Sequence, residues 1–180
     1  TVQISRMQYF LTSINVVTTY IRFLFFPINQ SIYHSYPITN SLLDNYTYIS
    51  VFINLTIIAS AFLIFKKSKL ISFGIFWFYI TISVESSIIP IRDVIFEHRL
   101  YLPLAGLAFL IAGLAMLLRE WKKILYSFFI MMIFLFSVLT YERNFVWKDE
   151  YSLWADAVKK SPESSIARYN FGNILYGQGN

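Results

Sequence analysis

The fold follows from residues 84–104, which read Val84-Glu85-Ser86-Ser87-Ile88-Ile89-Pro90-Ile91-Arg92-Asp93-Val94-Ile95-Phe96-Glu97-His98-Arg99-Leu100-Tyr101-Leu102-Pro103-Leu104. The segment places ionisable side chains between two long apolar runs, namely Glu85, Arg92, Asp93, Glu97, His98 and Arg99. Apolar membrane-spanning helices cannot solvate such charges, so the segment must face lipid headgroups, a water-filled cavity or another polar domain. The sequence therefore predicts a charged loop between two transmembrane helices.

The composition on either side of this loop indicates an integral membrane protein. Of 180 residues, 57% are hydrophobic and 14% are charged, whereas a soluble domain carries about a quarter charged residues. The mean hydropathy is +0.55. The absence of cysteine excludes disulfides and thiolate metal sites. The net charge of +5 comes from basic residues at the ends of apolar runs, which favours orientation in a membrane over binding of nucleic acid.

Five apolar runs have the length of a membrane-spanning helix, which needs about 17–25 residues to cross a layer of about 30 Å. They occupy residues 7–26, 48–65, 70–89, 101–118 and 124–141. Polar residues dilute the first run, for which a position partly in the membrane interface is the alternative. The fourth run contains small residues at spacings that let helices approach closely, among them Gly106 and Gly113. We therefore predict an all-α fold, with a polytopic transmembrane bundle of about five spans in residues 1–141.

The basic residues predict the orientation of this bundle. Arg6 and the clusters in residues 66–69 and 119–123 lie on one side if five spans alternate. The positive-inside rule makes that side cytoplasmic. The predicted loop 86–100 and the C-terminal tail then lie outside the cytoplasm. The expected location is a bacterial inner membrane, or the endoplasmic reticulum if the chain is eukaryotic.

From residue 142 the chain becomes more charged, and its apolar residues recur with a helical period. Asp149 is placed to cap a helix that runs to about Lys160. Ser164 or Ser165 is placed to cap a second helix after Pro162. Residues 142–180 are therefore predicted to form a helix pair that is too small to bury a core alone.

The second helix of this pair resembles the first helix of a tetratricopeptide repeat. Phe171, Gly172, Leu175 and Gly179 match the order of large and small residues in that repeat, and Arg168 departs from it where the repeat has tryptophan. One repeat does not stand alone, so the resemblance implies further repeats in a longer protein.

Two further motifs resemble the transmembrane, tetratricopeptide-repeat-containing protein O-mannosyltransferases and their bacterial relatives. The first is Glu85-Ser86-Ser87, Pro90, Asp93 and Glu97-His98-Arg99-Leu100-Tyr101-Leu102-Pro103; the second is Arg143-Asn144, Trp147 and Glu150-Tyr151-Ser152-Leu153-Trp154. The resemblance implies a C-type glycosyltransferase that takes a sugar from a polyprenyl-phosphate carrier outside the cytoplasm. The catalytic carboxylate of such enzymes usually lies in the first external loop, before the part that this chain resembles, so the catalytic residue here stays unknown.

The charged loop supplies the tentative residues for binding the lipid phosphate. Arg92 and Arg99 offer guanidinium groups that bind phosphate oxygens through paired hydrogen bonds, or they form a structural network with the neighbouring carboxylates. Glu97 and His98 orient an acceptor hydroxyl, or they fix the loop. Glu85 lies near the end of a span and needs a partner, for which Arg92 or Arg99 is the natural candidate.

Three functions stay open on the sequence. The first is part of a membrane glycosyltransferase that uses a polyprenyl-phosphate sugar donor and binds a protein acceptor or partner through its repeats. The second is a non-enzymatic membrane anchor that presents the repeats, and the third is a polysaccharide ligase or polymerase. The bilayer is a partner in each case, and nucleic acid in none. The sequence indicates no cofactor and leaves open a divalent metal in the whole protein.

Overall fold

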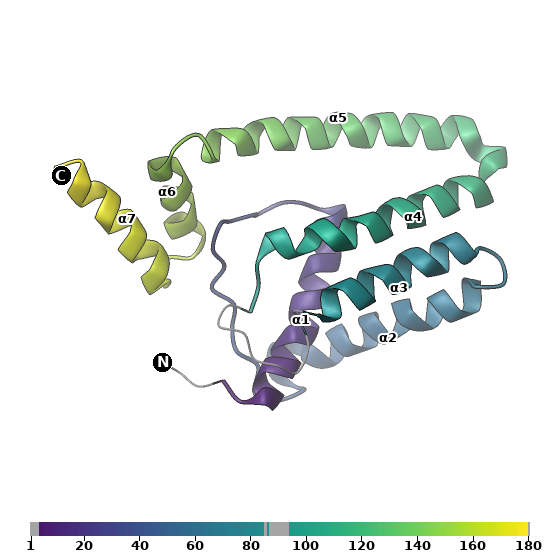
Figure 1. The fold of residues 1–180 in the computed structure, drawn as a ribbon, viewed down its shortest axis with the longest axis horizontal. Coiled ribbons are helices and arrows are strands. Elements are labelled where there is room, and N and C mark those ends of the chain that lie inside the picture. The colour runs from purple at the N-terminus through teal and green to yellow at the C-terminus, as the bar shows by residue number, and fades with distance from the viewer. Residues whose placement is uncertain (1–3, 85, 87–93, 180) are drawn as a thin grey trace. The chain divides into compact units, whose positions relative to one another are not determined.

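The computed structural model describes residues 4–84, 86 and 94–179. All regular secondary structure in these residues is helical. The α-helices are α1 (Arg6–Phe25), α2 (Thr47–Ile64), α3 (Lys69–Ser83), α4 (Tyr101–Leu117), α5 (Lys122–Val146), α6 (Glu150–Lys160) and α7 (Ser165–Gly177). Short 3-10 helices, η1 (Asp44–Tyr46), η2 (Glu97–Leu100) and η3 (Arg119–Trp121), precede α2, α4 and α5. The predicted all-α fold is confirmed for this part of the chain (Figure 1).

Three helical segments of the described chain are long and apolar enough to cross a membrane, namely Asp44–Ile64, Glu97–Leu117 and Arg119–Val146. They correspond to the second, fourth and fifth predicted spans. Helix α3 is apolar but has only 15 residues, and its predicted span continued into residues that the structure does not describe. Helix α1 has 20 residues but is not among the membrane-length apolar helices. Three of the five predicted spans thus coincide with helices long and apolar enough to cross a membrane, and the number of about five spans stays a prediction.

The chain divides into two compact units, which we describe separately. Unit 1 comprises residues 1–26 and 36–122, and unit 2 comprises residues 27–35 and 123–180. In unit 1, α2, α3 and α4 lie side by side in that order (Figure 1).

Several polar side chains of α1 in unit 1 are buried and form hydrogen bonds within the protein. Asn15 is 5% exposed, and its amide nitrogen donates to the hydroxyls of Thr39, at 3.1 Å, and Thr47, at 2.8 Å. Thr12 is also buried, and its hydroxyl accepts from the backbone N–H of Thr39 at 3.0 Å. Buried polar groups are costly unless they are hydrogen-bonded. These bonds therefore offset the cost of burying the polar residues that lower the hydropathy of α1.

Helices α3 and α4 of unit 1 meet backbone against backbone. A Cβ atom added to Gly74 would lie 2.5 Å from the carbonyl oxygen of Gly106, and one added to Gly106 would lie 2.5 Å from that of Gly74. Any larger side chain at either position would force the helices apart. The indole N–H of Trp77 also donates to the carbonyl of Leu102 at 3.0 Å. The prediction that small residues in the fourth apolar run permit a close helix contact is confirmed.

Helices α6 and α7 form a hairpin in unit 2 with the predicted caps. The Asp149 side chain accepts from the backbone N–H of Ser152 at the start of α6, and the Ser164 side chain accepts from that of Ala167 at the start of α7. Ala157 and Ala167 are fully buried, and the rings of Tyr151 and Phe171 lie 5.3 Å apart. The helix pair is as predicted, whereas its assignment to a tetratricopeptide repeat stays a prediction.

Helix α5 extends beyond the predicted last span, which ended at residue 141. It continues to Val146, because a helix needs only its own backbone hydrogen bonds and does not end where the apolar run ends. The predicted boundary between the membrane region and the C-terminal region therefore falls inside a helix.

Candidate functional site

Three of the predicted site residues lie together in one turn at the start of α4. Phe96 is extended, with φ −140° and ψ 135°, and the chain then enters η2, which contains Glu97, His98 and Arg99. This 3-10 helix runs directly into α4, so the predicted loop 86–100 ends at Phe96 rather than at residue 100. Glu97 and Arg99 are partly exposed, and His98 is exposed. We call residues 97–99 the charged turn.

Apolar contacts on both sides anchor the charged turn in unit 1. Ile95 before it is 3% exposed and Leu100 after it is 8% exposed. Both belong to a cluster of buried apolar side chains contributed by α1 and α3, which includes Val16, Tyr20, Phe78 and Ile82. The ionisable groups thus project from a segment whose neighbours are fixed in the protein interior.

A buried tyrosine holds the backbone immediately before the charged turn. The N–H of Phe96 donates to the hydroxyl oxygen of Tyr20 at 2.9 Å, and that hydroxyl lies 3.0 Å from the carbonyl oxygen of Phe96, to which it donates. Tyr20 is fully buried in α1. The Tyr20 hydroxyl therefore forms the hydrogen bonds with the N–H and the carbonyl of Phe96 that a neighbouring strand forms with an extended residue in a sheet.

The ring of Phe96 orders two side chains of the charged turn. The His98 ring is stacked on it, with 5.0 Å between ring centroids and 27° between ring planes. The Cζ atom of Arg99 lies 5.4 Å from the centroid of the same ring, a cation–π distance. A guanidinium N–H of Arg99 donates to the carbonyl of Val94 at 3.2 Å. Phe96 thus links the backbone clamp of Tyr20 to the positions of His98 and Arg99.

The charged turn combines one cationic and one anionic side chain with the N-terminus of an apolar helix. Helix α4 contains no acidic or basic residue between Tyr101 and Leu117. No charged side chain within the helix therefore offsets the partial positive charge of its N-terminus. Arg99 adds a full positive charge there, and its guanidinium suits phosphate oxygens. Glu97 is the carboxylate of the same turn. Arg99 and the helix N-terminus are the parts of the turn that attract an anion, whereas the Glu97 carboxylate repels one.

The other ionisable residues of the predicted charged loop are not described by the structure. Glu85, Arg92 and Asp93 lie outside the residues that the structure describes. The predicted pairing of Glu85 with Arg92 or Arg99 therefore stays a prediction. Sequence reasoning missed Tyr20 and Phe96, although a tyrosine hydroxyl that becomes buried in a helix needs a hydrogen-bond partner.

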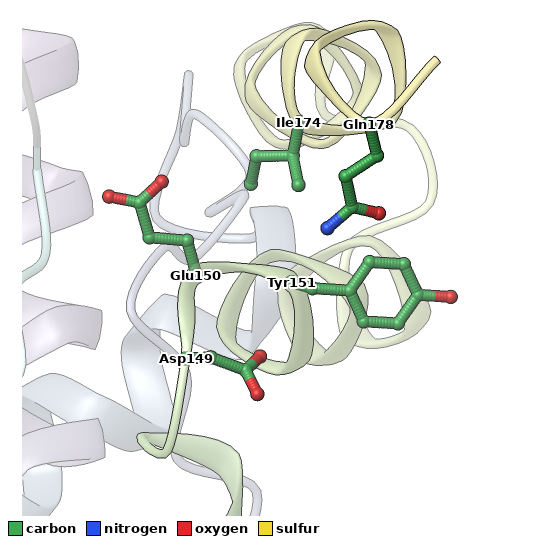
Figure 2. A pocket seen from close by; sticks show the side chains of 5 residues that line it. All are labelled: Asp149, Glu150, Tyr151, Ile174 and Gln178. Carbon is green, nitrogen blue, oxygen red and sulfur yellow. The ribbon is translucent and has the colours of Figure 1, made fainter. Parts of the chain in front are cut away.

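A second candidate region lies in unit 2, between the start of α6 and the end of α7. Asp149, Glu150, Tyr151, Ile174 and Gln178 line a cavity of about 530 Å³ (Figure 2). Ile174 and Gln178 project from α7 toward α6 (Figure 2). Hydrogen bonds from the backbone and side chain of Ser152 hold the pKa of Asp149 below its ordinary value, so this carboxylate is engaged in capping α6. The cavity therefore offers surface for contact rather than a reactive group.

One ionic cluster fastens α6 in unit 2. The Asp156 carboxylate accepts from Arg143 of α5 and from Lys160, both at 2.8 Å. Burial raises the pKa of Asp156, but the bonds from Lys160 and Arg143 outweigh burial and hold that pKa below its ordinary value. Lys160 also donates to the backbone carbonyl of Gln30, so the cluster joins three segments of unit 2.

Across the described residues, no three histidine, aspartate or glutamate side chains gather as a metal site would require. No family model, curated protein or solved structure matches the chain. The resemblance to membrane mannosyltransferases therefore stays a prediction, and the charged turn is the observation on which a functional proposal depends.

Proposed function

We propose that the chain is the carrier-binding part of a membrane glycosyltransferase that takes a sugar from a polyprenyl phosphate. In this proposal Arg99 binds the carrier phosphate, and Glu97 and His98 face the acceptor. The observation that carries the proposal is the position of the charged turn, which directly precedes a helix long and apolar enough to cross a membrane. A polyprenyl phosphate needs both environments, because its chain is apolar and its phosphate is charged.

Two features of the turn support a phosphate ligand. The Arg99 side chain rests against the ring of Phe96 and the carbonyl of Val94, which reduces the rotamer freedom lost on binding. The N-terminus of α4 adds the partial positive charge of the helix dipole. A lysine would supply the charge without the planar fork, so the proposal assigns a specific role to arginine.

The test is binding of a polyprenyl phosphate to the protein in nanodiscs, comparing the wild type with Arg99→Ala and Arg99→Lys. A charge-assisted hydrogen bond contributes about 1.5–3 kcal/mol, so Arg99→Ala is expected to weaken binding by about tenfold or more. Arg168→Ala is the matched control, because Arg168 is an exposed arginine of α7 in unit 2. Equal binding by the wild type and Arg99→Ala would move the phosphate away from the turn and overturn the proposal.

The alternative is a membrane anchor that presents the α6–α7 pair to protein partners. Helix α5 favours it, because none of its residues is buried and it leads within four residues into α6. An anchor requires only a span, so unrelated spans should replace α1 to α5 without loss of function. A carrier-binding protein should lose function after that exchange. A polysaccharide ligase is separated from both by its donor, a glycan linked through pyrophosphate.

A further inference from the structure

The basic residues of unit 1 are concentrated beyond the ends of two helices. Lys66, Lys67 and Lys69 lie in the turn between α2 and α3 and at the start of α3, while Arg119 and Lys122 follow α4; all five side chains are exposed. Glu120 lies among them, 3.6 Å from Arg119, and this fully solvated pair contributes little attraction. We call these five basic residues the basic end.

The packing of α3 against α4 brings the two parts of the basic end together. A Cβ atom added to Gly113 of α4 would lie 3.3 Å from the hydroxyl oxygen of Ser68 and 3.0 Å from the backbone nitrogen of Ile71. Ser68 immediately precedes Lys69, and Arg119 follows Gly113 by less than two helical turns, or about 9 Å. The turn from α2 to α3 and the end of α4 lie at the same end of unit 1 (Figure 1).

The basic end also lies where two membrane-length segments terminate. Asp44–Ile64 ends two residues before Lys66, and Glu97–Leu117 ends two residues before Arg119. Phe65 and Trp121 border the basic residues and are 50% and 62% exposed, as aromatic side chains at a membrane interface are. The charges therefore stand just beyond the apolar length of both segments, at the depth of lipid headgroups.

We propose that the basic end is a binding surface for the phosphate headgroups of anionic phospholipids. The basic end has five basic residues in two separate turns and one acidic residue, Glu120, among them. Clusters of this kind next to a span attract anionic lipid. The described residues at the opposite end of the same helices are of mixed charge, including Asp44, Glu97 and Arg99. The adjoining apolar helices make lipid the occupant, rather than a soluble anion or nucleic acid. The inference is independent of the glycosyltransferase proposal.

The test measures the preference of the protein for phosphatidylglycerol over phosphatidylcholine. The protein is reconstituted in membranes that carry either lipid with a spin label, and the immobilised fraction gives the relative association constant. A basic residue near an anionic surface contributes a factor of about five, so the wild type should prefer phosphatidylglycerol several-fold at low salt. The triple change Lys66→Gln, Lys67→Gln, Lys69→Gln should lower this ratio several-fold, to what Arg119 and Lys122 alone support. High salt should do the same to the wild type.

Two matched variants control for charge and for folding. The triple change to arginine at Lys66, Lys67 and Lys69 keeps the charge and should keep the preference. Lys148→Gln, Lys159→Gln, Arg168→Gln removes the same charge from exposed positions of unit 2 and should also keep it. A ratio that is near one in the wild type, or unchanged in the glutamine variant of the basic end, would overturn the proposal. So would lysine-dependent binding of a labelled RNA without any preference between the lipids.

Discussion

Replacing Tyr20 with phenylalanine removes the hydroxyl that holds the backbone before the charged turn and keeps the ring in its buried position. The N–H and the carbonyl of Phe96 lose their bonds to Tyr20, at 2.9 and 3.0 Å. An unsatisfied buried polar group costs about 1–3 kcal/mol. Because Phe96 is partly exposed and water can replace some of the loss, we expect the turn to become easier to open by about 2 kcal/mol.

Hydrogen exchange at the Phe96 amide measures this opening directly. A loss of about 2 kcal/mol corresponds to roughly 30-fold faster exchange in a peptide that covers residues 94–100, as long as exchange follows local opening. Tyr101→Phe is the matched control, since Tyr101 adjoins the same turn but is 79% exposed. That variant should exchange like the wild type.

The same variant also separates the geometry of the turn from its function. If Phe96 positions Arg99 for a phosphate, Tyr20→Phe should weaken binding of a polyprenyl phosphate while the rest of unit 1 keeps its protection. Unchanged exchange at Phe96 in Tyr20→Phe would refute the clamp itself. Faster exchange with unchanged binding would retain the clamp and remove its link to the carrier.

Further substitutions test the packing of each unit. Gly106→Ala should destabilise unit 1 by about 1–3 kcal/mol in chemical denaturation, because its Cβ would lie 2.5 Å from the carbonyl of Gly74. Gly172→Ala meets nothing within 4 Å and should be neutral or stabilising. Asn15→Ala should cost about 2 kcal/mol by the same measurement, since the hydroxyls of Thr39 and Thr47 each lose one hydrogen bond. Asp156→Asn should loosen α6, with a pH signature: the depressed pKa of Asp156 stabilises the fold above the unfolded value of 3.8, and this is lost as the pH falls toward the lower folded pKa. Unfolding of the wild type and the variant should therefore converge below about pH 4, and a constant difference down to pH 2 would contradict the assignment.

The sequence predicted the helices well where local signals determine them. Asp149 and Ser164 cap α6 and α7 as expected, because a capping side chain acts on a backbone N–H only three residues away. Apolar runs likewise identified the three membrane-length segments. Helix α5 continues past the last apolar run, which ends at residue 141, since loss of apolar character at Glu142 does not interrupt helical hydrogen bonding.

The candidate site was predictable in its charges but not in its support. Glu97, His98 and Arg99 stood out because ionisable residues are scarce between apolar runs. Tyr20 and Phe96 lie 76 positions apart, and their bond depends on how α1 packs in the folded protein. For the first apolar run, hydropathy does not reveal that Asn15 has hydrogen-bond partners inside the protein, and its assignment as a span stays a prediction.

The hydrogen bonds of α1 also limit the order in which unit 1 folds. Helix α1 precedes the rest of unit 1 in the chain, yet Asn15 bonds to threonines that follow it by 24 and 32 positions. The partner of the Tyr20 hydroxyl, Phe96, lies 76 positions later in the chain. These polar groups of α1 are therefore synthesised before their partners, and until those partners emerge they depend on water, translocon or chaperone for hydrogen bonds.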